Sequence, residues 1–202
     1  RQIKSLSQRA LKVAQNNIAG FVALMASSIS ILWLRNQSSY SVFPASSFIQ
    51  PEVVQSIASE FPQDEDSFIL SAWDFVERHI AYEPISSDVK FYDSTVRCLK
   101  CLLPSETLRR RKANCVGTSS LLASLLRTRL PADSIRLVMG NVTLDGIGGH
   151  AWVEVQRQGI WYVLESTSPS SLPWKTVESM SRIYIPEVHI SDRVVCDSPT
   201  LC

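Results

Sequence analysis

The sequence has almost no charge imbalance, because 20 Lys and Arg residues face 19 Asp and Glu residues and the formal net charge is +1. Nucleic-acid-binding domains usually carry a clear basic excess, so we expect no nucleic-acid partner. Glycine is scarce, with seven residues in 202, and no glycine motif that would cradle a phosphate is present. The sequence also lacks internal repeats and a metal-protease helix motif. These absences argue against nucleotide-binding, repeat and zinc-protease classes.

The composition that remains is that of a globular protein, with 45% hydrophobic and 19% charged residues. A chain of this length can form one ordinary domain with an appendage. We expect the domain to cover residues 52–202. A polar segment rich in serine and proline, residues 37–51, reads as a linker before it. Near the C-terminus, residues 181–185 are expected to form an edge strand that Pro186 stops.

The N-terminal appendage, residues 1–36, is predicted to be one long helix. Its second half, residues 18–34, contains no charged residue, and that length is at the short edge of a membrane span. Basic residues precede it, which would place that end in the cytoplasm. The alternative is a helix packed in a protein assembly, including a viral one. Residues 1–34 are therefore expected to anchor the chain to a membrane or to other proteins, and the localisation stays open.

The chemistry is concentrated between residues 112 and 167. Asn114 is a good N-cap, and leucines recur at helical spacing after it, so a helix is predicted to begin at Cys115. The positive end of a helix dipole favours a thiolate in the first turn, and the thiolate is the nucleophilic form of cysteine. A basic run, residues 109–112, adds positive charge just upstream. Cys115 is therefore the candidate nucleophile.

A β-hairpin is predicted to follow, with strands near residues 151–155 and 160–164 and a polar turn at Gly159. His150 begins the first strand and Glu165 ends the second. Antiparallel pairing brings these two ends together, so the carboxylate can orient the imidazole and stabilise its charged form. Nucleophile, base and acid in this order indicate a cysteine hydrolase or acyltransferase.

These residues resemble the transglutaminase-like superfamily, whose core is papain-like. The resemblance covers roughly residues 65–170 and implies an α+β fold, in which the helix bearing Cys115 packs on an antiparallel sheet bearing His150 and Glu165. The matching segments are residues 114–115, 125–127, 135–140, 149–155 and 161–165, with weaker matches at residues 75–82 and 104–108.

The resemblance implies a protease or amidase that acts on a peptide or isopeptide bond of a protein or peptide substrate, through a thioester and without a cofactor. Two positions depart from the family's pattern. Glu165 replaces the usual Asp, and Val116 follows the nucleophile where cross-linking members often have Trp. No acidic calcium loop is visible. A cross-linking acyltransferase and a non-catalytic protein that keeps the fold in a membrane or viral assembly remain as alternatives.

The oxyanion hole and the other cysteines are less well determined. The backbone N–H of Cys115 is the natural first oxyanion donor, and Asn114 and Tyr82 are candidates for the second. Four further cysteines could be free thiols, two disulfides or, as a weak alternative to no metal site, zinc ligands. They are Cys98, Cys101, Cys196 and Cys202.

Overall fold

The computed structural model describes residues 40–84, 89–92, 95–143, 148–167, 174–191 and 195–196. The long N-terminal helix predicted for residues 1–36 lies outside these residues. Among the residues that are described, no helix is both long and apolar enough to cross a membrane. The structure described below belongs to one compact unit, which begins at Tyr40.

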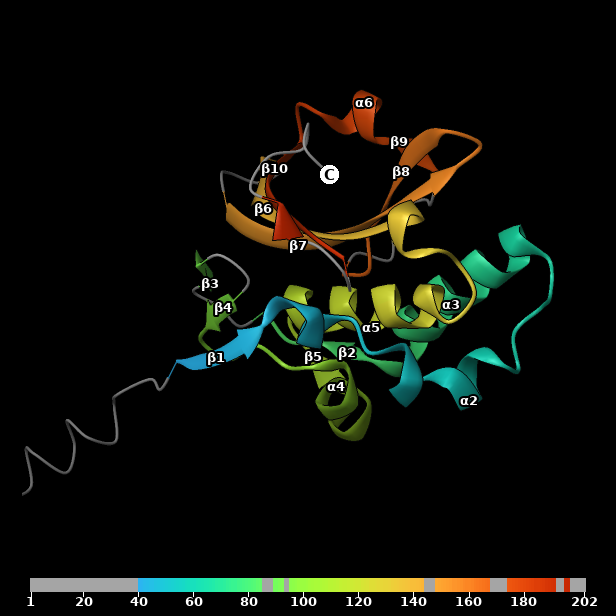
Figure 1. Ribbon diagram of the computed structural model, residues 1–202, viewed down its shortest axis with the longest axis horizontal. Coiled ribbons are helices and arrows are strands. Elements are labelled where there is room, and N and C mark those ends of the chain that lie inside the picture. Colours follow the sequence, from blue (N-terminus) through green and yellow to red (C-terminus); the bar gives the residue numbers. More distant parts are fainter. Residues whose placement is uncertain are drawn as a thin grey trace, which may run out of the picture. The chain divides into compact units, whose positions relative to one another are not determined.

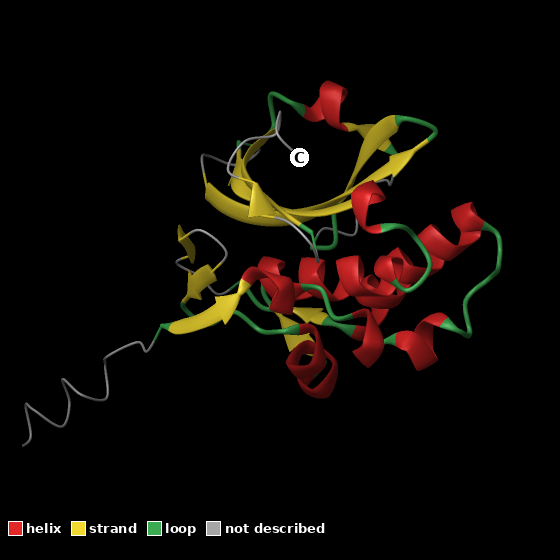
Figure 2. Ribbon diagram, viewed as in Figure 1, coloured by secondary structure: helices red, strands yellow, loops and turns green. Residues whose placement is uncertain are grey.

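Helix α5 (Cys115–Arg127) lies at the centre of this unit. Its first twelve residues are all buried, and its leucines belong to the main hydrophobic core. The Asn114 side chain caps the helix by accepting a hydrogen bond of 3.2 Å from the Gly117 N–H, as the sequence predicts. Figures 1 and 2 show α5 covered by a curved sheet on one side and by other helices on the opposite side. Because neighbouring elements pack against every side of α5, the helix is held in place, and so is its first turn, which carries Cys115.

The sheet that covers α5 has six strands in the order β11-β10-β6-β7-β8-β9. On β7, Ala151, Val153 and Val155 lie in the same core cluster as the α5 leucines. Strand alternation turns the residues between them to the opposite face, where Trp152 packs with Tyr184 in a second, smaller cluster. The strands are β6 (Ile135–Val142), β7 (Gly148–Arg157), β8 (Ile160–Leu164), β9 (Lys175–Thr176), β10 (Tyr184–Ile190) and β11 (Val195–Cys196).

Strands β7 and β8 form the predicted hairpin. Gln158 and Gly159 make its two-residue turn with φ angles of 50° and 80°, as a type I′ turn requires. Pairing starts at Arg157 opposite Ile160 and ends at Val153 opposite Leu164. From Glu165 onward the chain no longer pairs with β7. The part of β7 that contains His150 is paired only with β6.

The edge strand predicted for residues 181–185 is wrong. Strand β10 runs through Pro186 to Ile190 and is an inner strand, between β6 and β11. Its register with β6 shifts between Pro186 and Val188, so the proline sits at a β-bulge, where a missing N–H is tolerated. Gly140 lies opposite Pro186, and a Cβ there would be 2.2 Å from the Ile185 carbonyl oxygen. The glycine therefore permits the close approach of the two strands.

The other face of α5 is covered by helices and short strands. Asp64 caps α3 by accepting a hydrogen bond of 2.8 Å from the Ser67 N–H. Two small sheets complete the unit, one of strand order β1-β4-β3 and one in which β2 pairs β5 in parallel. The remaining elements are β1 (Ser41–Pro44), η1 (Ala45–Phe48), η2 (Pro51–Val53), α2 (Gln55–Ala58), α3 (Glu65–His79), β2 (Ala81–Tyr82), β3 (Val89–Tyr92), β4 (Thr95–Cys98), α4 (Pro104–Arg110), β5 (Lys112–Ala113), η3 (Ala132–Ser134) and α6 (Val177–Met180).

The linker predicted for residues 37–51 is wrong from Tyr40 onward. Strand β1 pairs with β4, and Phe48 is fully buried in the core that contains α5. The Gln50 N–H also donates a hydrogen bond of 2.9 Å to the Ser124 hydroxyl on α5. Serine and proline made this segment resemble a linker, but its few apolar side chains are enough to hold it against the domain.

Candidate active site

Cys115 is the first residue of α5, at the junction of a loop and a helix, where the sequence places it. It is a free cysteine and only 7% of its surface is exposed. The residue is therefore nearly enclosed, and it lies at the N-terminus of the helix. This position favours a negative charge on sulfur.

His150 links the other two predicted site residues. Its Nε2 lies 2.7 Å from Oε2 of Glu165, and its ring also lies close enough to the Cys115 thiol for the two groups to interact electrostatically. Because Nε2 faces the carboxylate, Nδ1 is the ring nitrogen left for the thiol. The structure thus brings Cys115, His150 and Glu165 together, from α5, from β7 and from the residue that follows β8.

Four hydrogen bonds reach the carboxylate of Glu165. Oε1 accepts from the Thr167 N–H at 2.8 Å and the Thr167 hydroxyl at 2.7 Å, and Oε2 accepts from the Tyr184 hydroxyl at 3.0 Å as well as from His150. The indole N–H of Trp73 on α3 donates to the Glu165 backbone carbonyl at 2.6 Å. Thr167, Tyr184 and Trp73 could not be recognised as site residues from the sequence, because no motif in the chain marks them. Together they hold Glu165, whose side chain is one methylene longer than that of Asp, in one place.

The charges in this cluster stabilise one another. Burial by itself lowers the pKa of His150, but its interactions with Cys115 and Glu165 raise it to about 10. Burial by itself raises the pKa of Glu165, and the hydrogen bonds and charge of His150, with the Thr167 hydrogen bonds, lower it overall. The imidazole is therefore held as an imidazolium beside the Glu165 carboxylate at neutral pH.

Tyr82, one of the two oxyanion candidates, lies close to the nucleophile. Parallel pairing of β2 with β5 sets Tyr82 beside Ala113, two residues before Cys115. Its side chain is 45% exposed. Burial of the phenol and then the charges of Cys115 and Glu165 raise the pKa of Tyr82, so the hydroxyl keeps its proton and remains a donor.

Asn114, the other oxyanion candidate, is buried, and its side-chain oxygen accepts the Gly117 N–H as the helix cap. The cap accounts for an asparagine at this position. Its role as an oxyanion donor stays a prediction.

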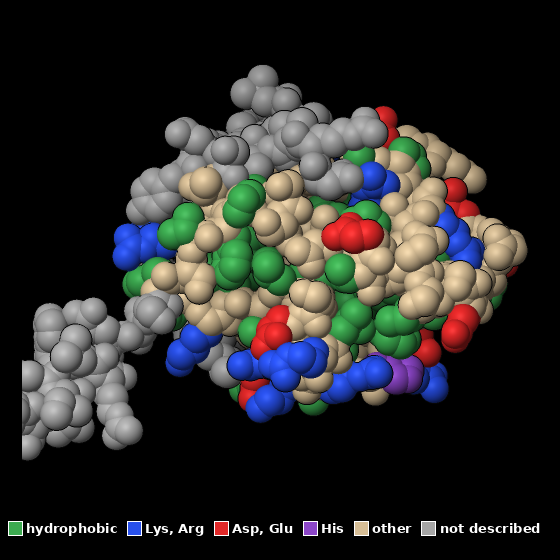
Figure 3. All heavy atoms as spheres, turned by 60° about the horizontal axis from the view of Figure 1, so that its bottom comes forward, with side chains coloured by type: hydrophobic (Ala, Val, Ile, Leu, Met, Phe, Trp, Pro, Cys, Tyr) green, Lys and Arg blue, Asp and Glu red, His purple; other side chains and the backbone are tan. Residues whose placement is uncertain are grey.

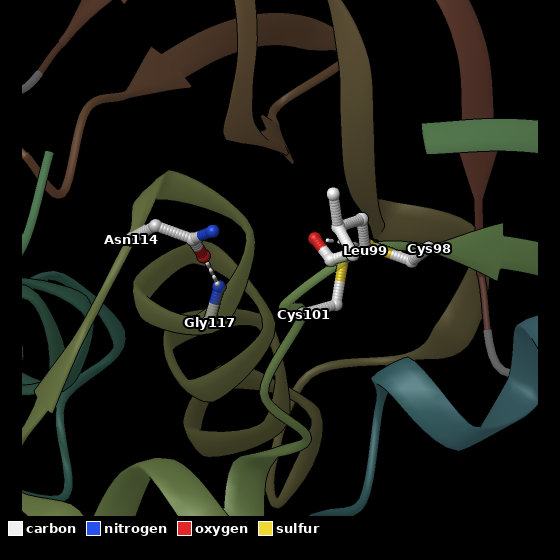
Figure 4. Close-up of a disulfide and its surroundings, with 5 residues drawn as sticks. All are labelled: Cys98, Leu99, Cys101, Asn114 and Gly117. Carbon is white, nitrogen blue, oxygen red and sulfur yellow. Dashed lines mark hydrogen bonds between the residues drawn. A yellow bond between two sulfur atoms is a disulfide. The ribbon is translucent and has the colours of Figure 1, made fainter. Parts of the chain in front are cut away.

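Cys98 and Cys101 form a disulfide, with their Cα atoms 5.8 Å apart. A disulfide has no thiolate to offer a metal, so the zinc site considered for these residues is wrong for this pair. Within the described part of the chain, no cluster of three or more His, Cys, Asp or Glu residues could hold a metal ion. The side chain of Cys196 and all of Cys202 lie outside the described residues. Figure 4 shows the disulfide close to the Asn114–Gly117 cap.

The basic run at residues 109–112 is largely paired with acids. Glu106 accepts from both Arg109 and Arg110, and Lys112 lies 2.7 Å from Glu83. Figure 3 shows Lys and Arg side chains on this face of the molecule with Asp and Glu side chains among them. Exposed pairs of this kind contribute little to stability, and their charges largely cancel. We therefore read the run as a solvated surface and not as a binding site.

The family model of the transglutaminase-like superfamily matches residues 51–166, more than half of the chain. The chain belongs to the transglutaminase-like superfamily. This span contains the three clustered residues and confirms the resemblance and the α+β fold expected from the sequence. A search of curated proteins gives no match.

Solved structures of similar fold share less than a quarter of their sequence with this chain. A candidate cysteine protease from Cytophaga hutchinsonii matches with 23% identity and a TM-score of 0.47, over 62% of this chain and 40% of that chain. LapG of Legionella pneumophila matches with 15% identity and a TM-score of 0.44, over 70% of this chain and 84% of that chain. Its EGTA-treated form matches with 14% identity and a TM-score of 0.46, over 76% and 92%.

Proposed function

We propose that this member of the superfamily is a cysteine hydrolase that cleaves a peptide or other amide bond through a Cys115–His150–Glu165 triad. The observation that carries the proposal is His150, whose Nε2 is hydrogen-bonded to the Glu165 carboxylate and whose ring interacts electrostatically with the Cys115 thiol. Nucleophile and base within hydrogen-bond reach, with a third group that orients the base, are the arrangement expected for nucleophilic catalysis.

The steps of the reaction follow from where the protons lie on Cys115 and His150. The Cys115 thiolate attacks the carbonyl carbon, and the resulting oxyanion is stabilised by the Cys115 backbone N–H, with Tyr82 as candidate second donor. His150 gives its Nδ1 proton to the leaving amine as the C–N bond breaks, which leaves a thioester on Cys115. Water then attacks the thioester, His150 takes a proton from it, and the acid departs as the thiolate reforms. Glu165 keeps its charge throughout and orients the ring.

Hydrolysis is favoured over transfer to an amine by the surroundings of Cys115. A transferase must hold an acceptor amine against the thioester, which aromatic walls commonly do. Val116 is 2% exposed and packs in the core, and Trp152 is fully buried against Tyr184. Neither side chain is available to line an acceptor site.

The test is incubation with a peptide library, analysed by mass spectrometry, with Cys115→Ala as control. We expect cleaved products that are absent with Cys115→Ala, while circular dichroism shows the same fold for both proteins. Adding a primary amine separates the two outcomes of the thioester. Mostly free acid supports hydrolysis, and mostly amine adduct at millimolar amine would instead support cross-linking. Cleavage that persists in Cys115→Ala would rule out the nucleophile, and no turnover by the wild type would favour a non-catalytic role.

A further inference from the structure

Three buried hydroxyl groups lie between the elements that carry the candidate triad. Thr118 and Ser119 belong to the first half of α5, and Ser166 directly follows Glu165; all three side chains are at most 5% exposed. Ser166 Oγ lies 3.1 Å from Thr118 Oγ1 and 3.2 Å from Ser119 Oγ. We call these three residues the hydroxyl cluster. It joins the helix of the nucleophile to the segment that presents the acid.

The hydrogens of the cluster can be assigned without conflict. Ser119 donates to the backbone carbonyl of Ala151 at 2.9 Å, and Thr118 donates to the carbonyl of Cys115 at 3.1 Å or to that of Asn114 at 3.2 Å. Each of these hydroxyls has one hydrogen, so both can then only accept. Ser166 supplies the donor to the pair on α5. Every hydroxyl hydrogen of the cluster therefore has an acceptor.

Each anchor of the cluster lies either next to a residue of the triad or one helical turn from it. Ala151 follows His150 and Ser166 follows Glu165, while Thr118 and Ser119 come one helical turn after Cys115 and so share its side of α5. Displacing any anchor would move the neighbouring side chain. Rates of reactions between positioned groups are sensitive to shifts of about 1 Å, which can cost on the order of a hundredfold.

Packing alone does not explain these hydroxyls. Alanine would fill the same space on a buried helix, have a higher helix propensity and leave no polar group to satisfy. Two other serines of α5 show the contrast. The Ser120 hydroxyl is buried without a hydrogen-bond partner among the described residues, and the Ser124 hydroxyl bonds to the Ser120 carbonyl and accepts from Gln50, on the segment before α2. Serines on one helix thus have different partners, and only Ser119 among these three reaches the triad strands.

We propose that Thr118, Ser119 and Ser166 are positioning residues that hold α5, β7 and the Glu165 segment in the register in which Cys115 and His150 meet. This rests on the proposed function, because it describes how the same site is kept in place. The cluster acts through the backbone of the residues beside the triad and touches no substrate.

The experiment measures the alkylation rate of Cys115 by iodoacetamide from pH 5 to 9, followed by peptide mass mapping so that other cysteines do not interfere. In the wild type, His150 should keep Cys115 reactive at pH 6. We expect Ser119→Ala combined with Ser166→Ala to lower the rate at pH 6 about tenfold and to change it little at pH 9, where an ordinary thiol ionises without help. Urea unfolding identifies the variants that remain folded, and the two single variants serve if the double variant does not fold.

Ser120→Ala and Ser124→Ala are the matched controls. Both remove a buried hydroxyl from the same helix, and neither should change the pH profile, although Ser124→Ala should lower stability by releasing Gln50. An unchanged profile in the folded cluster variants, or the same loss in the controls, would overturn the proposal. A wild-type Cys115 no more reactive at pH 6 than a model thiol would contradict the proposed function and the cluster's role with it. If Cys115 is reactive at pH 6 in the wild type and equally reactive in the variant with both cluster substitutions, the positioning role is contradicted and the proposed function is not.

Discussion

The Glu165 carboxylate shows how one extra methylene is accommodated. The family commonly has Asp here, and the longer side chain has one more torsion to fix. Thr167 takes one oxygen and Tyr184 shares the other with His150. Burial and the charge of Glu165 raise the pKa of Tyr184, so its hydroxyl stays a donor. These bonds restrict the carboxylate to the orientation in which it meets Nε2.

The first prediction concerns the pH dependence of the rate in Glu165→Gln. The pKa of His150 is raised to about 10, in part by the hydrogen bond and charge of Glu165, so removing that charge lowers it. The imidazolium that protonates the leaving amine is then lost at a lower pH. We expect the basic limb of kcat/KM to move down by about one pH unit or more, with a larger loss of rate at pH 9 than at pH 6.

Glu187→Gln is the control for this substitution, because Glu187 is an exposed acid on β10 that bonds to Asn141. It should leave the profile unchanged. A basic limb at the same pH in wild type and Glu165→Gln would show that Glu165 does not support the imidazolium.

Among the elements, β10 depends on a residue of a different strand. Gly140 on β6 lies opposite Pro186, and an added Cβ would be 2.2 Å from the Ile185 carbonyl oxygen and 2.9 Å from the Pro186 Cα. Both are backbone atoms, which cannot rotate away. We predict that Gly140→Ala lowers the free energy of unfolding by about 3 kcal/mol, measured by urea denaturation.

Gly148→Ala is the matched control, since Gly148 lies on β7 of the same sheet and no atom is within 4 Å of its added Cβ. Its effect should stay within about 0.5 kcal/mol. Equal stabilities for the two variants would mean that the strands separate at little cost and that the bulge does not require glycine.

The disulfide joins the end of β4 to the loop before α4. Leu102, the residue after Cys101, lies 3.4 Å from the Cβ that an alanine would have at Gly117, in the first turn of α5. We predict that Cys98→Ser combined with Cys101→Ser destabilises the domain by about 2 kcal/mol, with little change in rate per folded molecule, because neither cysteine contacts His150 or Glu165. Thermal unfolding and active-site titration measure the two effects separately. A lower rate at unchanged stability would assign the pair to the chemistry.

For the whole molecule, the domain boundary lies earlier than the sequence indicates. The compact unit starts at Tyr40, and β1 and Phe48 belong to its structure. We predict that a fragment of residues 40–202 unfolds in one cooperative transition, and that a fragment of residues 52–202, which lacks β1 and Phe48, is markedly less stable. Thermal scans of both fragments test this. No cooperative transition for residues 40–202 would mean that residues 1–39 are needed for folding.

The segment of residues 1–36 stays an expectation at this scale. Its uncharged second half keeps the proposal that it anchors the domain to a membrane or to a protein assembly. Comparing how the full chain and the fragment of residues 40–202 sediment with lipid vesicles would test the membrane form of that proposal.

Local patterns in the sequence were enough to predict the elements whose signals are short-range. A cap followed by leucines at helical spacing defined α5 and placed Cys115 at its start, and alternation around a Gly159 turn defined the hairpin. Because the hairpin is antiparallel, its ends had to meet, so the approach of His150 and Glu165 also followed from short-range pattern. These features depend on residues near one another in the chain.

Features that join distant parts of the chain could be seen only in the folded protein. Pro186 reads locally as the end of a strand, but Gly140, far earlier in the chain, accommodates its bulge, and β10 continues as an inner strand between β6 and β11. Ser119 looks like a small filler on α5 until Ala151, 32 residues away, accepts its hydrogen. A hydroxyl or a proline has the same local signature whichever partner it finds. Its role is therefore fixed only when packing of the buried helix against the sheet brings that partner within hydrogen-bond distance.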